Sequence, residues 1–337
     1  MIKEKIEKVI SRGNLTFDES FSVMSEIMDG AVNNSLISAL LIALKSKGEI
    51  PAEVAGFAKA MREKSVKIKC GDENAVDVCG TGGDNSGTFN ISTAAAFVVA
   101  GTGVKVAKHG NRSISSKCGS ADVLTELGVN INLTPEQAEK ALKEIGITFM
   151  FAPLYHPAMK HVMPVRRELG MRTVFNMLGP LTNPAGTKRQ LIGTFNDTAA
   201  GLISESLKYL EMEKVCIVCT DNRFDEITLD GNTTVMEYVA GNKVKSYKVN
   251  NGTFGYPAVN AAKIKGDSAN ENAAIMAKMF LDRKKSDPFY VVAANAAFGL
   301  FAAGAAKTIK ECRDIAEDSI ISGKAFDKLE QLKNFKG

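Results

Sequence analysis

The segment DVCGTGGDNSGTFNIST, residues 77–93, contains residue types whose spacing suggests chemistry. Gly80, Gly82 and Gly83 follow a short apolar run, and glycines let a backbone turn tightly and bring its amide groups close to a ligand. The NIST tetrapeptide, residues 90–93, leads into an alanine-rich helix, so its N–H groups lie at the positive end of a helix dipole. This pattern favours phosphate binding, although glycine-rich turns also serve as plain connections.

The two best-known phosphate-binding motifs are missing from the sequence. There is no G-x-x-x-x-G-K-[ST], and Asn85 occupies the third glycine position of G-x-G-x-x-G. Kinase-type and dehydrogenase-type folds therefore lose their main support.

A second polar segment, AKHGNRSISSKCGSADVLTELG, follows the next predicted strand. Its cations, amides, hydroxyls and glycines are Lys108, His109, Gly110, Asn111, Arg112, Ser113, Ser115, Ser116, Lys117, Gly119 and Ser120. Such a cluster at the carboxyl end of a strand fits a crevice for a polyanion. A solvated surface loop has the same composition, but two such loops after consecutive strands favour a binding site.

An acidic pair, Asp225-Glu226, follows a third buried-strand pattern. In a chain already equipped for phosphate, adjacent carboxylates suggest Mg²⁺ bridged to a pyrophosphate. An isolated Asp-Glu pair is usually only a polar loop, so this prediction depends on the two phosphate segments.

Cysteine spacing gives no comparable signal. Cys216 and Cys219 form a C-x-x-C within KVCIVCT, but this run is typical of a buried strand, on which residues three apart face opposite sides. A zinc or redox pair needs both sulfurs on one side. We therefore expect no structural metal site here.

The elements that must position these residues change in kind near residue 70. Residues 1–70 carry helical patterns, including a capping box at Thr16–Glu19 and a helix-starting Pro51. From residue 71, the runs AVDVC, GVKVAK, ITFMFA and EKVCIVCT alternate with helical segments, which is typical of a parallel α/β sheet. The segment TTVMEYVAGNKVKSYKV predicts two hairpin strands at the margin of this sheet.

The sequence therefore predicts an α/β fold with two domains. A small all-helical N-terminal domain, residues 1–70, is joined by helices from about 157–184 and is hinged to a large α/β domain, residues 71–337, with a mostly parallel central sheet.

Bulk composition agrees with a globular protein. The 337 residues include 45% apolar residues, and 42 Lys and Arg against 38 Asp and Glu give a net charge of +4, too small to demand nucleic acid. No run approaches the about 18 apolar residues of a membrane span, and the charged start MIKEKIEKVI lacks a signal-peptide core. We expect a cytoplasmic protein without nucleic-acid or membrane partners.

Five motifs, in order over almost the whole chain, resemble the anthranilate phosphoribosyltransferase family of tryptophan biosynthesis. They are GTGGD (80–84), NIST (90–93), KHGNRSISSKCGSADVLTELG (108–128), HPAMKHVMPVRRELGMRTVFNMLGPLTNPA (156–185) and the Asp-Glu pair. The visible departures are small, such as Cys118 where serine is common. The resemblance implies a nucleoside phosphorylase-like fold, usually a homodimer, that joins the amino group of anthranilate to C1′ of phosphoribosyl pyrophosphate (PRPP) with Mg²⁺ and releases pyrophosphate.

The resemblance also implies roles for individual residues. The PRPP site would comprise Gly80, Gly83, Asp84, Thr88, Asn90, Ile91, Ser92, Thr93, Lys108, His109, Gly110, Asn111, Arg112, Ser113, Ile114, Ser115, Ser116 and Ser120. The magnesium ligands would be Ser92, Asp225 and Glu226. The anthranilate site would comprise Gly80, Asn111, His156 and Arg166. The catalytic residues would be Lys108, Asp225, Glu226 and Arg166.

The sequence leaves alternatives open for the role of Arg166 and for the function. Without the resemblance, Arg166 reads as an exposed helical charge beside Arg167 and Glu168. A pyrimidine nucleoside phosphorylase of similar fold is the nearest enzymatic alternative, and the Asp-Glu pair and Asn111 favour the transferase. A non-enzymatic, nucleic-acid-binding relative would be expected to show a larger basic excess and a degraded phosphate loop.

Overall fold

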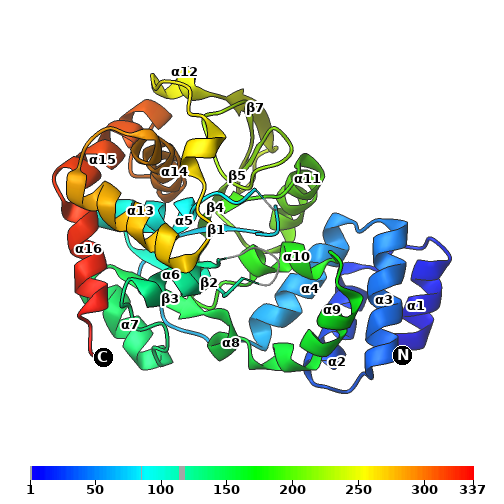
Figure 1. The fold of residues 1–337 in the computed structure, drawn as a ribbon. Coiled ribbons are helices and arrows are strands. Elements are labelled where there is room, and N and C mark those ends of the chain that lie inside the picture. Colours follow the sequence, from blue (N-terminus) through cyan, green and yellow to red (C-terminus); the bar gives the residue numbers. More distant parts are fainter. Residues whose placement is uncertain (1, 85, 114–117) are drawn as a thin grey trace.

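The computed structural model describes residues 2–84, 86–113 and 118–337. One seven-stranded sheet separates two hydrophobic clusters. The N-terminal helices (blue) lie on one side of the molecule and the C-terminal helices (orange to red) on the other (Figure 1). The predicted fold class, a helical N-terminal part with a mostly parallel α/β part, is confirmed.

Four helices open the chain. They are α1 (Ile2–Ile10), α2 (Phe17–Met28), α3 (Asn34–Lys47) and α4 (Pro51–Glu63). The predicted capping box is present, because the Glu19 amide donates to the Thr16 hydroxyl (3.1 Å) and the Thr16 amide donates to the Glu19 carboxylate (2.8 Å). Pro51 lies in the first turn of α4, where its missing N–H costs no hydrogen bond. The inner faces pack together around Leu40 and Phe57.

The sheet is parallel except at one margin. Its strands are β1 (Val76–Gly80), β2 (Val106–Gly110), β3 (Ile147–Phe151), β4 (Arg189–Gly193), β5 (Lys214–Thr220), β6 (Thr233–Val239) and β7 (Lys245–Val249). Their order is β3-β2-β1-β4-β5-β6-β7, with β6 and β7 antiparallel, which confirms the predicted hairpin. The chain moves outward from β1 on one side and returns beside it at β4. The carboxyl ends of β1 and β4 therefore form a topological switch point, where open α/β sheets bind ligands.

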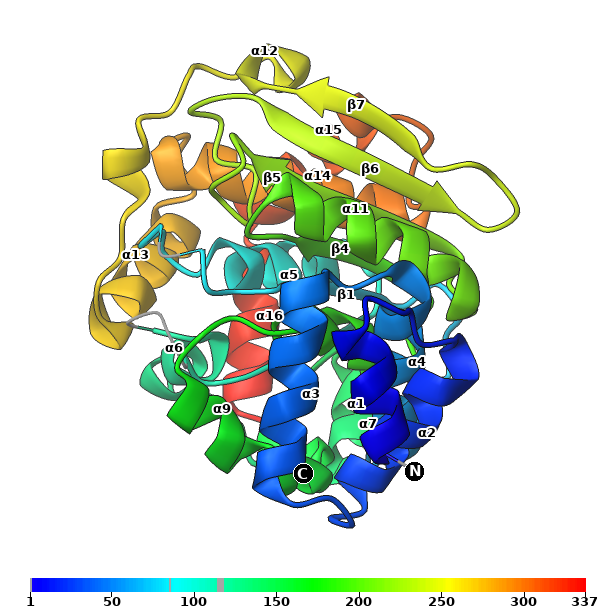
Figure 2. The ribbon, with the colours of Figure 1, turned by 90° about the vertical axis from the view of Figure 1, so that its right-hand side faces the viewer.

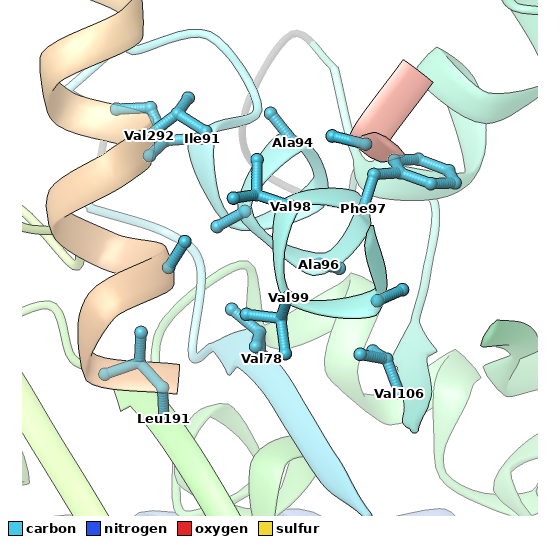
Figure 3. Packing of buried hydrophobic residues seen from close by; sticks show 14 of the residues in the cluster. Val78, Ile91, Ala94, Ala96, Phe97, Val98, Val99, Val106, Leu191 and Val292 are labelled. Atoms are coloured by element: carbon cyan, nitrogen blue, oxygen red, sulfur yellow. The ribbon is translucent and has the colours of Figure 1, made fainter. Parts of the chain in front are cut away.

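One face of the sheet is covered by helices of the α/β part. These are α5 (Ile91–Gly101), α6 (Ser120–Glu126), α7 (Pro135–Glu144), α13 (Ala269–Asp282), α14 (Asp287–Ala303), α15 (Ile309–Ile321) and α16 (Lys324–Lys333). Val78 and Leu191 pack against α5 and against Val292 of α14 (Figure 3). Their neighbours Cys79 and Ile192 belong to the other cluster, because successive strand residues point to opposite faces.

The other face is covered by N-terminal helices and by a later helical segment. That segment follows α8 (Ala152–Tyr155), whose Tyr155 packs in the first cluster, and contains η1 (Pro157–His161), α9 (Met163–Leu169), α10 (Phe175–Leu178) and η2 (Gly179–Thr182). The helix α11 (Asp197–Ser206) follows β4. Val165, Phe175 and Leu178 share the hydrophobic cluster of α1 to α4. Figure 2 shows α9 beside α3.

Asn183 anchors the end of this segment to the sheet. Its amide nitrogen donates to the Asp77 carboxylate (2.7 Å) and to the Ala107 carbonyl (2.9 Å), while the Ala185 amide donates to its oxygen (2.8 Å). The buried Asn183 side chain thus uses both its amide nitrogen and its oxygen in hydrogen bonds. These bonds hold the end of the segment against β1 and β2.

Three strand details differ from the sequence prediction. The strand β4 was not foreseen, because RQLIG carries no alternation and few β-branched residues. β1 and β2 run further than predicted, to Gly80 and to Gly110, since pairing with β4 and β3 continues to those residues.

The remaining helical turns are short. They are η3 (Leu207–Tyr209), α12 (Asn251–Phe254) and η4 (Ala261–Ile264). Within residues 2–84, 86–113 and 118–337, no helix has the length and apolar character needed to cross a bilayer.

Candidate active site

The GTGGD loop lies at the switch point and is held by the ends of neighbouring strands. The Thr81 amide donates to the Gly193 carbonyl at the end of β4 (2.9 Å). The Gly82 amide donates to the Asp225 carboxylate in the loop after β5 (2.9 Å). The structure therefore brings the predicted phosphate loop and the predicted acidic pair together, although 141 to 143 residues separate them along the chain.

Two glycines make this close approach possible. A Cβ on Gly80 would lie 2.7 Å from the Asp225 carboxylate, and a Cβ on Gly193 would lie 1.5 Å from the Asp225 backbone oxygen. A Cβ 1.5 Å from a backbone oxygen cannot be accommodated, and a Cβ on Gly80 would force the Asp225 carboxylate to shift. The observed place of Asp225 therefore depends on the missing Cβ at both strand ends. Gly193 was not among the predicted site residues, because its role depends on a neighbour remote in sequence.

Three carboxylates crowd this position. The Asp225 amide donates to the Asp84 carboxylate (3.4 Å), and Glu226 follows directly. Burial raises the pKa of Asp225, and the Asp84 charge raises it further. Burial also raises the pKa of Glu226, with Asp225 as the next cause. Enclosed like charges are costly unless a cation joins them.

The donor set fits magnesium. Carboxylate oxygens are the ligands that Mg²⁺ prefers, and it usually takes one or two of them together with substrate phosphates and water. No complete cage of three His, Cys, Asp or Glu side chains occurs in the described part of the chain. An incomplete set of this kind suits an ion that arrives with a phosphate ester.

The N-terminus of α5 carries the NIST residues and contacts Glu226. The Ser92 amide donates to one Glu226 oxygen (3.2 Å), and the Thr88 hydroxyl donates to the other (2.9 Å). The Asn90 amide donates to the Asn272 side chain (2.8 Å). A carboxylate thus occupies the place that the helix dipole offers to an anion.

The Lys108 side chain extends from β2 to β1. It is only 4% exposed and donates to the Val78 carbonyl (2.6 Å). Burial lowers the pKa of Lys108, and the Asp77, Cys79 and Glu226 charges oppose this shift. The cation therefore lies buried between β1 and β2, within electrostatic reach of Asp77 and Glu226.

The segment after β2 is tied down at both described ends. Arg112 forms an ion pair with Asp122 (2.6 Å), and the Ser113 amide donates to the same carboxylate (3.2 Å). The Ser120 hydroxyl donates to the Asn111 carbonyl (3.3 Å). The predicted site residues Ile114, Ser115 and Ser116 lie outside the described residues.

Two buried histidines, His109 and His156, lie between the sheet and the helical segment. Their ring centroids are 5.0 Å apart. Burial lowers the pKa of His109 to about 3 and that of His156 to about 4, so both rings are neutral near pH 7. One nitrogen of each ring, Nε2, has no hydrogen-bond partner in the described part of the chain. Neutral rings of this kind suit an aromatic ligand better than proton transfer at neutral pH.

Arg166 lies on α9, on the helical side of the site. Its guanidinium carbon is 5.5 Å from the centre of the Phe175 ring. Burial lowers the pKa of Arg166, and no carboxylate pairs with it among the residues described. The neighbouring Arg167 is exposed. Arg166 is therefore a half-buried cation with an unused capacity to bind a carboxylate.

Two models of known protein families match the chain. The helical bundle domain of a glycosyl transferase family matches residues 3–65, and the a/b domain of a glycosyl transferase family matches residues 72–326. Fold and site thus define a glycosyl transferase. The anthranilate phosphoribosyltransferase of Pelotomaculum thermopropionicum is 46% identical over 337 residues, covering 100% of this chain and 97% of that relative. The chain belongs to the anthranilate phosphoribosyltransferase family.

Solved structures agree with this assignment. Anthranilate phosphoribosyltransferase from Thermus thermophilus has a TM-score of 0.92 and 39% identity, with 98% of each chain covered. The Saccharomyces cerevisiae enzyme, solved in complex with PRPP and Mg, has a TM-score of 0.89 and 26% identity, with 98% of this chain and 96% of that chain covered. The resemblance and enzyme class are confirmed, and the matches support the transferase over the phosphorylase and the nucleic-acid-binding alternative.

Proposed function

We propose that this protein transfers the phosphoribosyl group of PRPP to the amino group of anthranilate, giving N-(5-phosphoribosyl)anthranilate and pyrophosphate. The observation that carries the proposal is the convergence of the GTGGD loop, the α5 N-terminus and the acidic pair at one switch point. These groups suit a metal-bound diphosphate. Membership of the family indicates anthranilate as the acceptor of the phosphoribosyl group.

On the phosphate side, we propose that backbone amides and hydroxyls bind PRPP. The PRPP residues predicted from the sequence keep that role here as a proposal. Asp225 and Glu226, with Ser92, would hold Mg²⁺, which when bound supplies positive charge to the departing pyrophosphate. Glu226 would turn from the Ser92 amide to the cation, and that amide would then be free for a phosphate oxygen.

The proposed chemistry needs charge stabilisation more than acid–base catalysis. As the bond between C1′ and pyrophosphate stretches, negative charge develops on the departing oxygens, and preorganised donors lower that cost. The Lys108 ammonium uses one N–H on the Val78 carbonyl and keeps two for the ligand. The anthranilate amine is an uncharged aniline at neutral pH, so no general base is assigned.

On the helical side, we propose that Arg166 binds the anthranilate carboxylate. A guanidinium matches a carboxylate with two parallel hydrogen bonds. His156, Asn111 and Gly80 would line the path of the aromatic ring. Holding the amine about 3–3.5 Å from C1′ would supply much of the rate enhancement through proximity.

A fluorescence assay tests the proposed function directly. Anthranilate fluorescence should decay when the protein is mixed with PRPP and Mg²⁺, and omitting any one component should stop the decay. Phosphate-dependent release of base from thymidine or uridine, without loss of anthranilate, would instead identify a nucleoside phosphorylase.

We also propose a homodimer that pairs through α1 and α3. These helices border an open groove of about 360 Å³ lined by Val9, Ile10, Arg12, Ala39, Ile42, Ala43, Ser46 and Lys47. Ile10 and Ile42 are large apolar side chains left 64% and 38% exposed. Light scattering on the eluting protein should give a dimer mass, and Ile42→Glu should give a monomer. The domain boundary near residue 70 and the cytoplasmic location remain predictions.

A further inference from the structure

A single side chain, Arg172, connects the helical segment to the phosphate loop. Its Nη2 donates to the Gly83 carbonyl. Its guanidinium carbon lies 4.5 Å from the centre of the Phe195 ring in the loop after β4. Its own carbonyl accepts a hydrogen bond from Lys45 of α3 (2.7 Å). Arg172 therefore touches three elements that surround the candidate site.

The local structure fixes Arg172 from both sides. Gly170 ends α9 in the left-handed conformation (φ 56°), which reverses the chain. The Thr173 amide donates to the Asn176 side chain (3.0 Å) at the start of α10. Because α9 and α10 belong to the hydrophobic cluster of the N-terminal helices, the position of Arg172 follows from that packing.

Gly83 depends on this contact more than its neighbours do. Thr81 and Gly82 are held by groups at the ends of β4 and β5. The Gly83 carbonyl accepts only from Arg172 among the residues described. Because a trans peptide is planar, a carbonyl turned toward Arg172 directs the Asp84 N–H to the opposite side. The glycine conformation (φ 71°) leaves this peptide otherwise easy to rotate.

We propose that Arg172 is a positioning residue for PRPP binding. It holds the Gly83–Asp84 peptide so that an N–H, and not a carbonyl oxygen, faces the phosphate ligand. It also joins the helical side of the site to the phosphate side. The inference rests on the proposed function, because that function places a phosphate at the loop. A lysine cannot replace it fully, since only the planar guanidinium stacks on Phe195 while donating to Gly83.

Steady-state kinetics of Arg172→Ala, Arg172→Lys and the matched control Arg167→Ala test the inference. Loss of a charged donor costs about tenfold or more, so KM for PRPP should rise at least about tenfold in Arg172→Ala. KM for anthranilate should stay within about twofold. The PRPP KM of Arg172→Lys should lie between those of wild type and Arg172→Ala, and that of Arg167→Ala should equal the wild-type value. Added guanidinium should partly lower the PRPP KM of Arg172→Ala.

Three results would overturn the inference. In Arg172→Ala, these are an unchanged KM for PRPP, a rise in the anthranilate KM instead, or a rise in the PRPP KM no larger than that in Arg167→Ala. If Arg172→Ala does not fold, Arg172→Lys answers the same question. Calorimetric binding of Mg²⁺–PRPP separates this inference from the proposed function. A wild type that binds PRPP but never consumes anthranilate refutes the function, while the comparison of PRPP affinities still decides the role of Arg172.

Discussion

The two sides of the candidate site contain different kinds of chemical groups. On the sheet side, glycines, backbone amides and three crowded carboxylates are joined by hydrogen bonds, and a buried lysine on β2 lies within electrostatic reach of Glu226. On the helical side, a half-buried arginine without a carboxylate partner among the described residues lies over an aromatic ring. Two neutral histidines lie between the helical segment and the sheet.

This difference matches the two ligands proposed for the site. Carboxylates that repel one another need a divalent cation, and rigid amides suit an inflexible phosphate, so the sheet side is arranged for a highly charged ester. A lone guanidinium over an aromatic ring suits an aromatic monocarboxylate. Each side should therefore respond to substitution through its own substrate, and four predictions test that separation.

Gly193→Ala should have the largest effect. The new Cβ would overlap the Asp225 backbone, so the acidic pair must move and the phosphate side loses its geometry. We expect turnover to fall by about 10³-fold, as displacements near 1 Å already cost about 10²-fold. Gly201→Ala is the matched control, because its Cβ would meet only the Met236 methyl at 4.0 Å within helix α11. Equal turnover of the two variants would refute the role of Gly193.

Asp225→Asn should separate activity from stability. Turnover should fall about 10²-fold through loss of charge on the phosphate side. Without metal, the variant should resist unfolding better than wild type by about 1 kcal/mol at pH 8. The raised folded-state pKa means that wild-type stability is present at low pH and is lost as pH rises through that pKa. The exposed Asp230→Asn should change neither property in urea titrations and assays.

Arg166→Ala should act through anthranilate alone. Loss of a charged hydrogen-bonded contact costs about 1.5–3 kcal/mol, so the anthranilate KM should rise about 10- to 100-fold. The PRPP KM should change less than about twofold. Initial rates with each substrate varied in turn give both constants, and an equal rise in both would show that Arg166 does not bind anthranilate.

Proton release on metal binding should be the smallest measurable effect. Raised pKa values keep part of the acidic pair protonated near pH 7, and a divalent cation must displace those protons. Wild type should release more protons than Asp225→Asn on binding Mg²⁺ with pyrophosphate, and the difference should shrink above about pH 9. Calorimetry in buffers of different ionisation enthalpy measures it. Identical release by both proteins at every pH would contradict the crowding of these carboxylates.

Local patterns made most elements predictable from the sequence. Capping residues such as Thr16 fix helix starts, and the β-branched runs fix four of the five parallel strands. β4 escaped prediction because RQLIG is short and has little periodic character. Its place is set by pairing with β1 and β5, which no local signal reveals.

The site was predictable where chemistry is concentrated in short motifs, as in GTGGD and the acidic pair. Gly193, Arg172 and Asn183 were missed because each acts on a residue more than 30 positions away, through a Cβ clash, a stacked guanidinium or a buried amide. The strand positions of His109 and Gly110 also depend on pairing with β3. Such roles become visible only once the sheet is assembled.

A crystal structure with PRPP, Mg²⁺ and anthranilate tests the central claim most directly. We predict the diphosphate between the GTGGD loop and the start of α5, near Lys108 and Asp225, with the anthranilate carboxylate on Arg166 and its amine facing C1′. A complex in which these three side chains line separate, unconnected surfaces would contradict the account.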